Sequence, residues 1–518
     1  MNPGSAGVRL DPRPLAAVSA AVVLLAVAGV VPTWPGLVHV VALPPLDLVS
    51  DLGALLTLAP SLPVFVLGTA AALLGRAAVL ALLLGGLTRA RFLWALRFYL
   101  VVSPLAAIAA VLLYGAGAVM FYLLFWAGVV VTLLLVGATA AAAWVAPGRV
   151  RSGFGTSARA GFRLGTVGCY VALLLVLGAL AELGGTVVQV LLVPVSAALT
   201  FAAARVLVHD PALSRRPRRA VAALPAAGAV ALLAAVLHGP AGPAQAGDPE
   251  NPRPGSLLLM SGVDSSSGSG AMLEIDPRSL GWTCERTRYF SYAGPGDGQP
   301  QNEAECPIDH GAPYEAADSL RGSDDVVPFL EQQVAPAPDP VVVATHSQGA
   351  WLVWEAAVTG RLPGVETLVL VGPFPDSGVP FATDEEPRAP VGRLVVDLVA
   401  DLPRPGGTTA FEPGSPLGVE WLARPERVRE VLSQPLPEGM RAISVTSAFD
   451  VPLMRGTHRL EHAVDACPVP VPHPNLPYSA ELHDAVQRFL DDEPLPPCAW
   501  WRSSLGPLLR HFAVPPPS

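Results

Sequence analysis

The sequence predicts two parts of different fold class: an α-helical membrane bundle of about seven spans, then an α/β domain with a mostly parallel sheet and a cap insertion. Apolar stretches of membrane-crossing length recur up to residue 238, whereas short apolar strands alternate with amphipathic helices after residue 256. Composition supports this division, since 52% hydrophobic and 14% charged residues make the chain too apolar for an ordinary soluble protein. The expected domains are 1–238 and 257–518, joined by a Gly/Pro-rich linker at 239–256.

Charge divides the chain at the same place. Up to residue 238 there are 15 arginines and five acidic residues, whereas the remainder has 18 arginines and 37 acidic residues. The sequence has no lysine, so arginine supplies every basic side chain. Nothing in this pattern resembles the basic surface that nucleic acid requires, and we expect no nucleic-acid partner.

Seven stretches are long and apolar enough to cross a bilayer core of about 30 Å. They lie at 14–34, 62–87, 98–118, 120–146, 164–183, 186–208 and 220–238. Arginines occur before the first span, between the second and third, between the fourth and fifth, and before the seventh. The loop 35–61 and the short hairpins near 119 and 185 contain none. Because arginine-rich loops stay on the cytoplasmic side, this alternation predicts a multi-pass cell-membrane protein with a cytoplasmic N-terminus and an extracytoplasmic soluble part.

Arg76 falls in the middle of the second apolar stretch, where a charge is costly. Either it contacts a substrate or ion, or it faces the interior of the bundle; we prefer the interior. The absence of another charge placed to form a relay gives a transporter little support.

The seventh span has two interpretations. RRPRR, an apolar run and AQAG at 244–247 have the three-part layout of a signal peptide, and cleavage after Ala246 would release the soluble part. The alternative, which we prefer, is a retained membrane anchor.

Strands are predicted in the second part at 257–260, 289–292, 341–344, 367–372 and 442–447. Helices are predicted at 314–334, 349–359 and 479–490. The segment 376–440 is too long for a plain connection and is interpreted as a partly helical cap.

Residues 341–350 read VVVATHSQGA, and T-H-S-Q-G differs by one letter from the G-x-S-x-G pattern of a serine nucleophile. A strand before it and the helix WLVWEAAV after it provide the strand, sharp turn and helix that such a nucleophile requires. We therefore take Ser347 as the candidate nucleophile, with a turn serine as the alternative.

A serine hydroxyl needs a histidine base and an acid that orients the imidazole, in the chain order serine, acid, histidine. Asp450 follows the strand 442–447 and is the candidate acid. His473, in a loop before the last convincing helix, is the candidate base. The other histidines after Asp450 are His458, His462, His483 and His511.

An oxyanion formed at the serine needs N–H donors aimed at it. The N–H of Gln348, the residue after the nucleophile, is one candidate. The N–H of Val263, in the loop SGVDSSSGSG after the first strand, is the other.

These residues together resemble an α/β-hydrolase of the lipase/esterase type over about 256–495, roughly half of the chain. FEPGSPLGVEWL at 411–422 also resembles an element found before the acid strand in lipase-like members. Thr345 in place of the first glycine departs from the family pattern. The resemblance implies a triad of Ser347, Asp450 and His473, no cofactor, and a lipid or small-molecule ester as substrate.

Four cysteines lie in the soluble part, an even number in a compartment that permits disulfides, while Cys169 lies in a predicted span. Sequence proximity favours Cys284 with Cys306 and Cys467 with Cys498. No C-x-x-C or H-x-x-x-H pair accompanies them, so we expect no metal site.

The leading hypothesis is a membrane-anchored extracytoplasmic serine hydrolase that cleaves carboxylic esters. An acyltransferase with the same triad is the nearest alternative, because only the acceptor of the acyl group differs. A non-catalytic, hydrolase-like binding domain on a membrane bundle is the alternative from another class.

Overall fold

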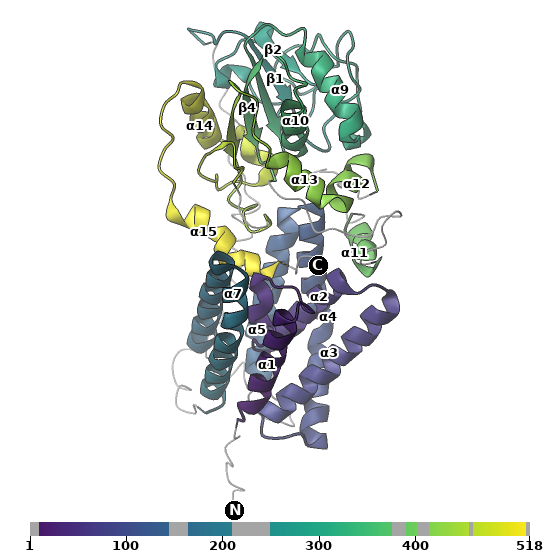
Figure 1. The fold of residues 1–518 in the computed structure, drawn as a ribbon, viewed down its shortest axis with the longest axis vertical. Helices are drawn as coiled ribbons and strands as arrows, with labels where there is room; N and C mark the ends of the chain where they lie inside the picture. Colours follow the sequence, from purple (N-terminus) through teal and green to yellow (C-terminus); the bar gives the residue numbers. More distant parts are fainter. Residues whose placement is uncertain are drawn as a thin grey trace, which may run out of the picture. The chain divides into compact units, whose positions relative to one another are not determined.

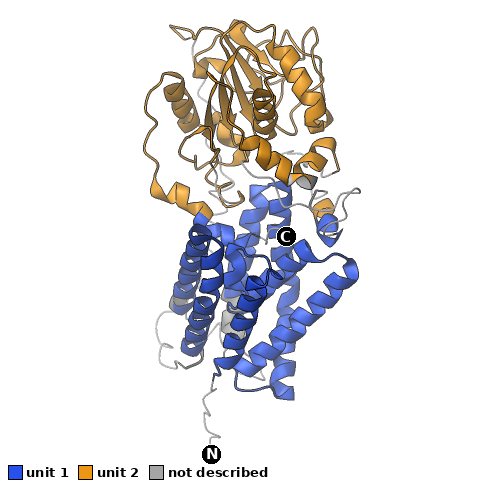
Figure 2. Ribbon diagram, in the orientation of Figure 1, with its two compact units in different colours: residues 1–235, 387–395, 507–518 blue, residues 236–386, 396–506 orange. Residues whose placement is uncertain are grey.

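The computed structural model describes residues 10–143, 164–209, 249–374, 390–400, 414–454 and 459–513. The chain forms two compact units (Figure 2). Unit 1 comprises Met1–Ala235, Pro387–Val395 and Pro507–Ser518; unit 2 comprises Val236–Glu386 and Val396–Gly506. Two segments that are distant in sequence therefore belong to the same unit as the helical N-terminal part.

Unit 1 is helical (Figure 1). Its elements are α1 (Arg13–Val27), η1 (Pro35–His39), α2 (Leu46–Leu58), α3 (Leu62–Leu83), α4 (Arg89–Val119), α5 (Tyr122–Ala143), α7 (Leu164–His209) and η6 (Arg510–Phe512). Within the described residues, three helical stretches are long and apolar enough to cross a membrane: Leu62–Leu83, Arg89–Val119 and Thr166–Leu207. α1 and Tyr122–Val136 are apolar but shorter. The predicted span 220–238 lies outside the described residues.

α7 is interrupted at Gly185, whose φ of 67° and ψ of −169° are not helical. A straight helix of its 46 residues would be about 69 Å long, more than twice the bilayer core. The two halves lie side by side (Figure 1), and the Tyr170 hydroxyl on one half lies 3.0 Å from Thr200 Oγ1 on the other. The hairpin predicted near residue 185 is therefore present.

The segment 35–61, predicted as a loop, instead contains η1 and α2. α2 carries Asp51, which accepts two hydrogen bonds from Arg76, from Nε at 2.7 Å and from Nη2 at 2.6 Å. Arg76 Nη1 also donates to the backbone oxygen of Val40 at 2.6 Å. The Arg76 side chain is only 11% exposed, so it faces the interior of unit 1, and α2 supplies the partner that its charge requires.

In the described part of unit 2, six strands form one sheet in which every pairing is parallel, in the order β2-β1-β3-β4-β5-β6. The strands are β1 (Ser256–Met260), β2 (Thr287–Tyr289), β3 (Val341–His346), β4 (Val365–Val371), β5 (Arg441–Val445) and β6 (Val464–Asp465). β1, β3 and β4 are almost continuously apolar and buried, as expected for parallel strands covered on both faces. Four predicted strands match within a few residues, and β6 has no counterpart among the predictions.

The predicted strand 289–292 is displaced, because β2 ends at Tyr289. One further ladder bond joins Phe290 N–H to Leu259 O, and then the backbone of Ser291 pairs with the Gln333 side chain instead of a strand. Side-chain competition for the backbone therefore ends this strand earlier than its aromatic residues indicate.

The helices of unit 2 cover both faces of the sheet, with α9 and α10 on one side and α14 on the other (Figure 1). The helices that lie wholly in unit 2 are α9 (Ser323–Val334), α10 (Gln348–Val358), α12 (Pro416–Ala423), α13 (Pro425–Leu432) and α14 (Ala480–Leu490). α15 (Trp500–Leu509) begins in unit 2 and ends in unit 1. α11 (Pro390–Ala400) is divided between the two units. The 3-10 turns are η2 (Pro277–Leu280), η3 (Cys284–Arg286), η4 (Ala316–Leu320) and η5 (His473–Tyr478).

The predicted cap contains α11, α12 and α13; its residues 376–389 and 401–413 lie outside the described ranges. In the motif at 411–422, Ser415 caps α12 by accepting a hydrogen bond from Gly418 N–H at 3.1 Å. α12 is fixed to α9 because Glu420 accepts from both the N–H and the hydroxyl of Ser323.

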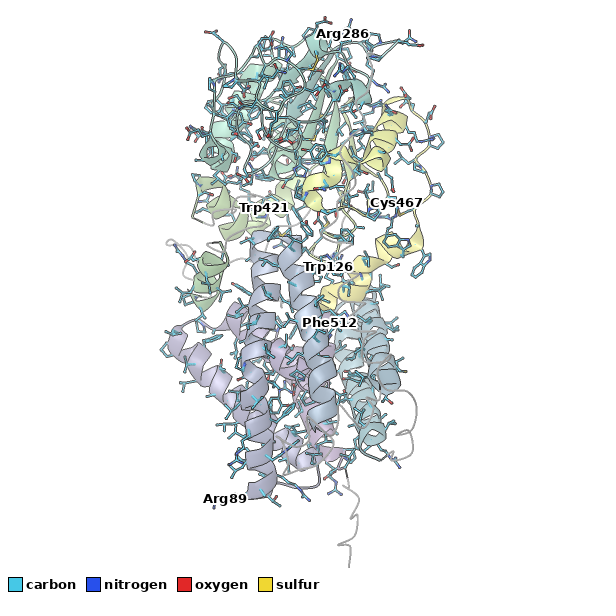
Figure 3. The ribbon with its side chains drawn as sticks, turned by 180° about the vertical axis from the view of Figure 1, so that it is seen from behind. Arg89, Trp126, Arg286, Trp421, Cys467 and Phe512 are labelled. Carbon is cyan, nitrogen blue, oxygen red and sulfur yellow. A yellow bond between two sulfur atoms is a disulfide. The ribbon has the colours of Figure 1, made fainter. Side chains whose placement is uncertain are left out.

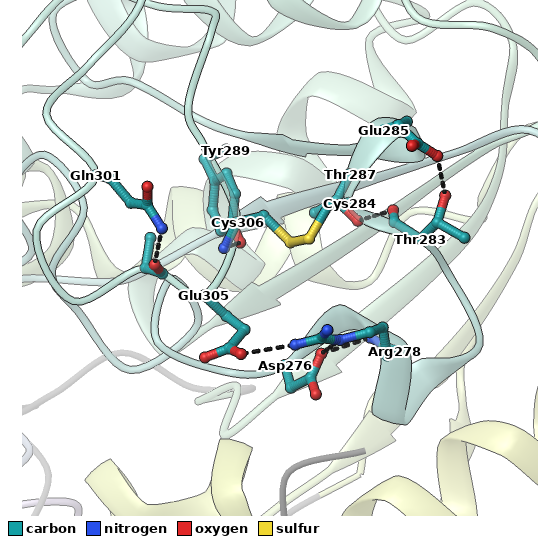
Figure 4. The surroundings of a disulfide bond; sticks show 11 residues. Asp276, Arg278, Thr283, Cys284, Glu285, Thr287, Tyr289, Gln301, Glu305 and Cys306 are labelled. Atoms are coloured by element: carbon teal, nitrogen blue, oxygen red, sulfur yellow. Dashed lines mark hydrogen bonds and ion pairs between the residues drawn. A yellow bond between two sulfur atoms is a disulfide. The ribbon is translucent and has the colours of Figure 1, made fainter. Parts of the chain in front are cut away.

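Both predicted disulfides are present. Cys284 is bonded to Cys306, and Cys467 to Cys498, with Cα–Cα distances of 5.4 and 5.0 Å. Near the first bond, Arg278 bridges Asp276 and Glu305 (Figure 4). Cys467 lies in the coil between β6 and α14 (Figure 3). Two disulfides in one unit indicate folding in an oxidising compartment.

Candidate active site

The candidate residues follow the carboxyl ends of four strands. Val263 follows β1 and Ser347 follows β3, while Asp450 follows β5 and His473 follows β6. Because all strands are parallel, these ends meet at one edge of the sheet. The strand order reverses between β1 and β3, and ligands of open parallel sheets bind in the crevice at such a switch point.

Ser347 occupies a strained turn between β3 and α10. Its φ of 57° and ψ of −122° lie where a residue with a side chain is seldom found, and such a conformation costs about 1–3 kcal/mol. The Ser347 N–H donates to Val371 O at 2.8 Å, which ties the turn to the end of β4. Ser347 is half-buried between buried neighbours. This is the strand–turn–helix geometry that presents a nucleophilic hydroxyl.

Two glycines permit this turn. A Cβ on Gly262 would lie 2.8 Å from Ser347 Cβ and 2.9 Å from His346 O, so the loop after β1 packs directly against the serine. A Cβ on Gly349 would lie 2.0 Å from Thr345 Oγ1. Thr345 is therefore accommodated in the glycine position of the pattern because Gly349 leaves its hydroxyl room.

His473 and Asp450 form a close pair. His473 Nδ1 lies 2.6 Å from Asp450 Oδ2, and the Asp450 side chain is fully buried. The carboxylate oxygen accepts this hydrogen bond, so Nδ1 is the donor, and in the neutral imidazole the lone pair is then on Nε2. His473 Nε2 is buried and has no hydrogen-bond partner among the described residues, Ser347 included. The ring is thus oriented by the acid, with its basic nitrogen available to accept a proton.

The His473 ring lies against the ends of β3 and β4. It stacks on Phe374 with a centroid distance of 5.2 Å, and it lies 4.6 Å from the ring of His346. A Cβ on Gly372 would lie only 2.7 Å from His473 Cε1. These contacts place the His473 ring against the end of β3, which Ser347 follows, and against the end of the neighbouring strand β4.

The two candidate oxyanion donors are available. Within the described part of the chain, neither Val263 N–H nor Gln348 N–H donates a hydrogen bond. The Gln348 side chain holds the surroundings by donating to Ser319 O at 2.5 Å and to the Tyr292 hydroxyl at 3.3 Å. Tyr292 in turn donates to Ser261 O at 2.7 Å, which fixes the loop after β1.

The other candidate bases have different partners. His462 pairs with Ser433 O and His483 with Pro477 O, and His511 contacts His39 in unit 1. Burial lowers the pKa of His483 below its ordinary value. His458 lies outside the described residues.

Among the residues that the structure describes, no group of three or more His, Cys, Asp or Glu side chains is arranged to hold a metal ion. His346 is a polar neighbour of the site to which the sequence pattern assigned no role. Its only signal in the sequence is its place beside Ser347 in T-H-S-Q-G. The sequence matches no protein-family model, and comparison with curated proteins finds no significant relative.

Proposed function

We propose that unit 2 is an α/β-hydrolase of the lipase/esterase type, which cleaves carboxylic esters through a serine acyl-enzyme. The observation that carries the proposal is the His473–Asp450 pair at the sheet edge where Ser347 occupies its strained turn, with a His473 Nε2 that has no hydrogen-bond partner among the described residues. Asp450 and His473 lie on separate segments, and a structural histidine would not need this alignment with an unpaired basic nitrogen.

The chemistry follows from these groups. Ser347 Oγ attacks the ester carbonyl carbon as His473 Nε2 takes its proton, and Asp450 stabilises the imidazolium that forms. The carbonyl oxygen becomes an oxyanion held by the N–H groups of Gln348 and Val263. Collapse expels the alcohol, which receives the proton from His473. Water activated by the same base then releases the acid and restores Ser347.

We further propose that the substrate is a lipid or small-molecule ester on the extracytoplasmic side of a cell membrane. Helices apolar enough to cross a membrane and two disulfides in unit 2 support this location. The alternation of arginine-rich loops in the sequence supports a cytoplasmic N-terminus.

A fluorophosphonate probe and p-nitrophenyl butyrate test the proposal on the full-length protein in detergent. We expect the probe to label Ser347, as identified by peptide mass spectrometry. Ser347→Ala and His473→Ala should each lower turnover by about 10⁴-fold or more, and the double variant should cost little more than either alone. Asp450→Asn should cost less than Ser347→Ala.

His483→Ala is the matched control, because it removes a histidine from the same region without touching Asp450. Wild-type labelling and turnover in Ser347→Ala would show that T-H-S-Q-G is only a turn. Turnover that occurs only with an added alcohol acceptor would instead identify an acyltransferase.

A further inference from the structure

His346, the last residue of β3, connects the strand that carries Ser347 to the main chain of His473. Its side chain is buried, with 6% of the residue exposed, and its Nε2 lies 3.1 Å from the backbone oxygen of His473. A carbonyl oxygen only accepts, so Nε2 of His346 carries a proton and donates it to this bond. The bond spans 127 positions in the sequence.

Two hydrogen bonds hold the coil that carries His473 from the β5 side. Val469 N–H donates to Thr446 O at 2.8 Å, and Ser447 Oγ donates to Val471 O at 2.6 Å. On the β3 side, among the described residues, His346 forms a hydrogen bond to the backbone of His473 itself. This bond links the main chain of His473 directly to the residue before Ser347.

The His346 ring also faces the ring of His473 at an interplanar angle of 43°. Burial, and then the proximity of His473, lower the pKa of His346 well below its ordinary value. His346 consequently stays neutral near pH 7 and does not repel the imidazolium that forms on His473 during the reaction.

We propose that His346 is a positioning residue of the hydrolase: its Nε2–H holds the backbone of His473 so that the base stays aligned between Asp450 and Ser347. This inference rests on the proposed function. It assigns a role to His346, whose imidazole is not needed for the turn at Ser347 itself.

Three substitutions separate the hydrogen bond from the space that the ring fills. His346→Gln places an amide N–H near the position of Nε2, whereas His346→Asn places it near Nδ1, one bond too short to reach. His346→Leu keeps an apolar side chain and has no donor. His483→Leu is the matched control, since it removes another histidine-to-carbonyl bond, to Pro477 O at 2.7 Å, without touching His473.

The experiment measures kcat and KM for p-nitrophenyl butyrate, and the fluorophosphonate labelling rate, from pH 5 to 9 with the full-length protein. We expect His346→Leu and His346→Asn to lower kcat about tenfold with KM unchanged, in proportion to one lost hydrogen bond. The labelling rate should fall in parallel, because a displaced His473 activates Ser347 less. His346→Gln should restore both values, and His483→Leu should change neither.

Equal losses of kcat in the Gln, Asn and Leu variants would show that His346 only packs. Wild-type kinetics in all three would also overturn the inference. Failure of the proposed function looks different, because the wild-type protein itself would then show no turnover and no labelling at Ser347. The Gln variant keeps the proposal testable even if the Leu or Asn variant folds poorly. A Gln variant that is stable but slow would contradict the positioning role.

Discussion

Backbone positions with positive φ decide how closely the candidate side chains approach one another. Ser347 accepts such a conformation although it has a side chain, and Gly372, with φ of 61°, provides the space into which His473 fits. At Gly372 a side chain would meet two penalties, the left-handed backbone and the contact with the imidazole. A side chain at residue 372 should therefore lower both the stability of unit 2 and the turnover.

Gly372→Ala should destabilise unit 2 by about 1–3 kcal/mol and lower turnover as well, because the methyl group displaces the His473 ring. Thermal unfolding and p-nitrophenyl butyrate hydrolysis measure the two effects. Gly360→Ala is the control, since Gly360 has a similar φ of 72° with nothing within 4 Å of its Cβ position. Turnover reduced no more in Gly372→Ala than in Gly360→Ala would contradict the proposed contact with the base.

The coil between β6 and α14 is the element that carries His473, and it has little regular structure before η5. The Cys467–Cys498 bond closes a separation of 31 residues that includes this coil and α14. The Cys284–Cys306 bond closes a separation of 22 residues on the β2 side of the sheet. Because the two loops are of similar length, the two bonds should restrict the unfolded chain to a similar degree. Only the loop closed by Cys467–Cys498 carries His473.

Replacing Cys467 and Cys498 by serine should destabilise unit 2 by about 3–4 kcal/mol and also lower turnover, because the coil that orients His473 is released. Replacing Cys284 and Cys306 should cost about the same stability while leaving turnover per folded molecule near the wild-type value. Unfolding midpoints and active-site titration with the fluorophosphonate probe distinguish the two pairs. Equal turnover in both double variants would show that the Cys467–Cys498 bond does not position His473.

Across the whole molecule, the chain returns to unit 1 after forming unit 2. In η6, Arg510 forms an ion pair with Glu182, and His511 Nδ1 lies 2.5 Å from His39 Nε2. Phe512 packs edge-on against His39 with a centroid distance of 5.1 Å. Residues 387–395 belong to unit 1 as well. Cleavage after Ala246 would therefore leave the downstream fragment with two segments of its own in unit 1.

Cleavage at a protease site inserted into 239–246 should leave unit 2 with the membrane fraction after a wash at high salt. The buried Arg510–Glu182 pair and the packed η6 hold it, since separating such a pair leaves a charge without its partner. Membrane flotation followed by immunoblotting measures retention. The same cut in a chain that ends at Gly506 should release more, and complete release of the intact C-terminus would refute the attachment.

Residues that are close together in the sequence determined much of what could be predicted from it. The apolar stretches, β3 with its following turn and helix, and both cysteine pairings depend on composition, periodicity or short separations that a linear sequence displays directly. The same information selected Ser347 and Asp450 as candidates, because each follows a predicted strand. It selected His473 because this residue lies in a loop before the last predicted helix, in the chain order that a triad requires.

Only the tertiary structure decided which distant groups meet. It joined His473 to Asp450 and His346, Arg76 to Asp51 on a helix that the sequence analysis predicted as a loop, and η6 to Glu182 and His39. β6 and the early end of β2 likewise depend on neighbours across the sheet and on the Gln333 side chain. The physical reason is that such contacts are set by how whole elements pack and by which buried polar groups must find partners, and neither is encoded in the spacing of adjacent residues.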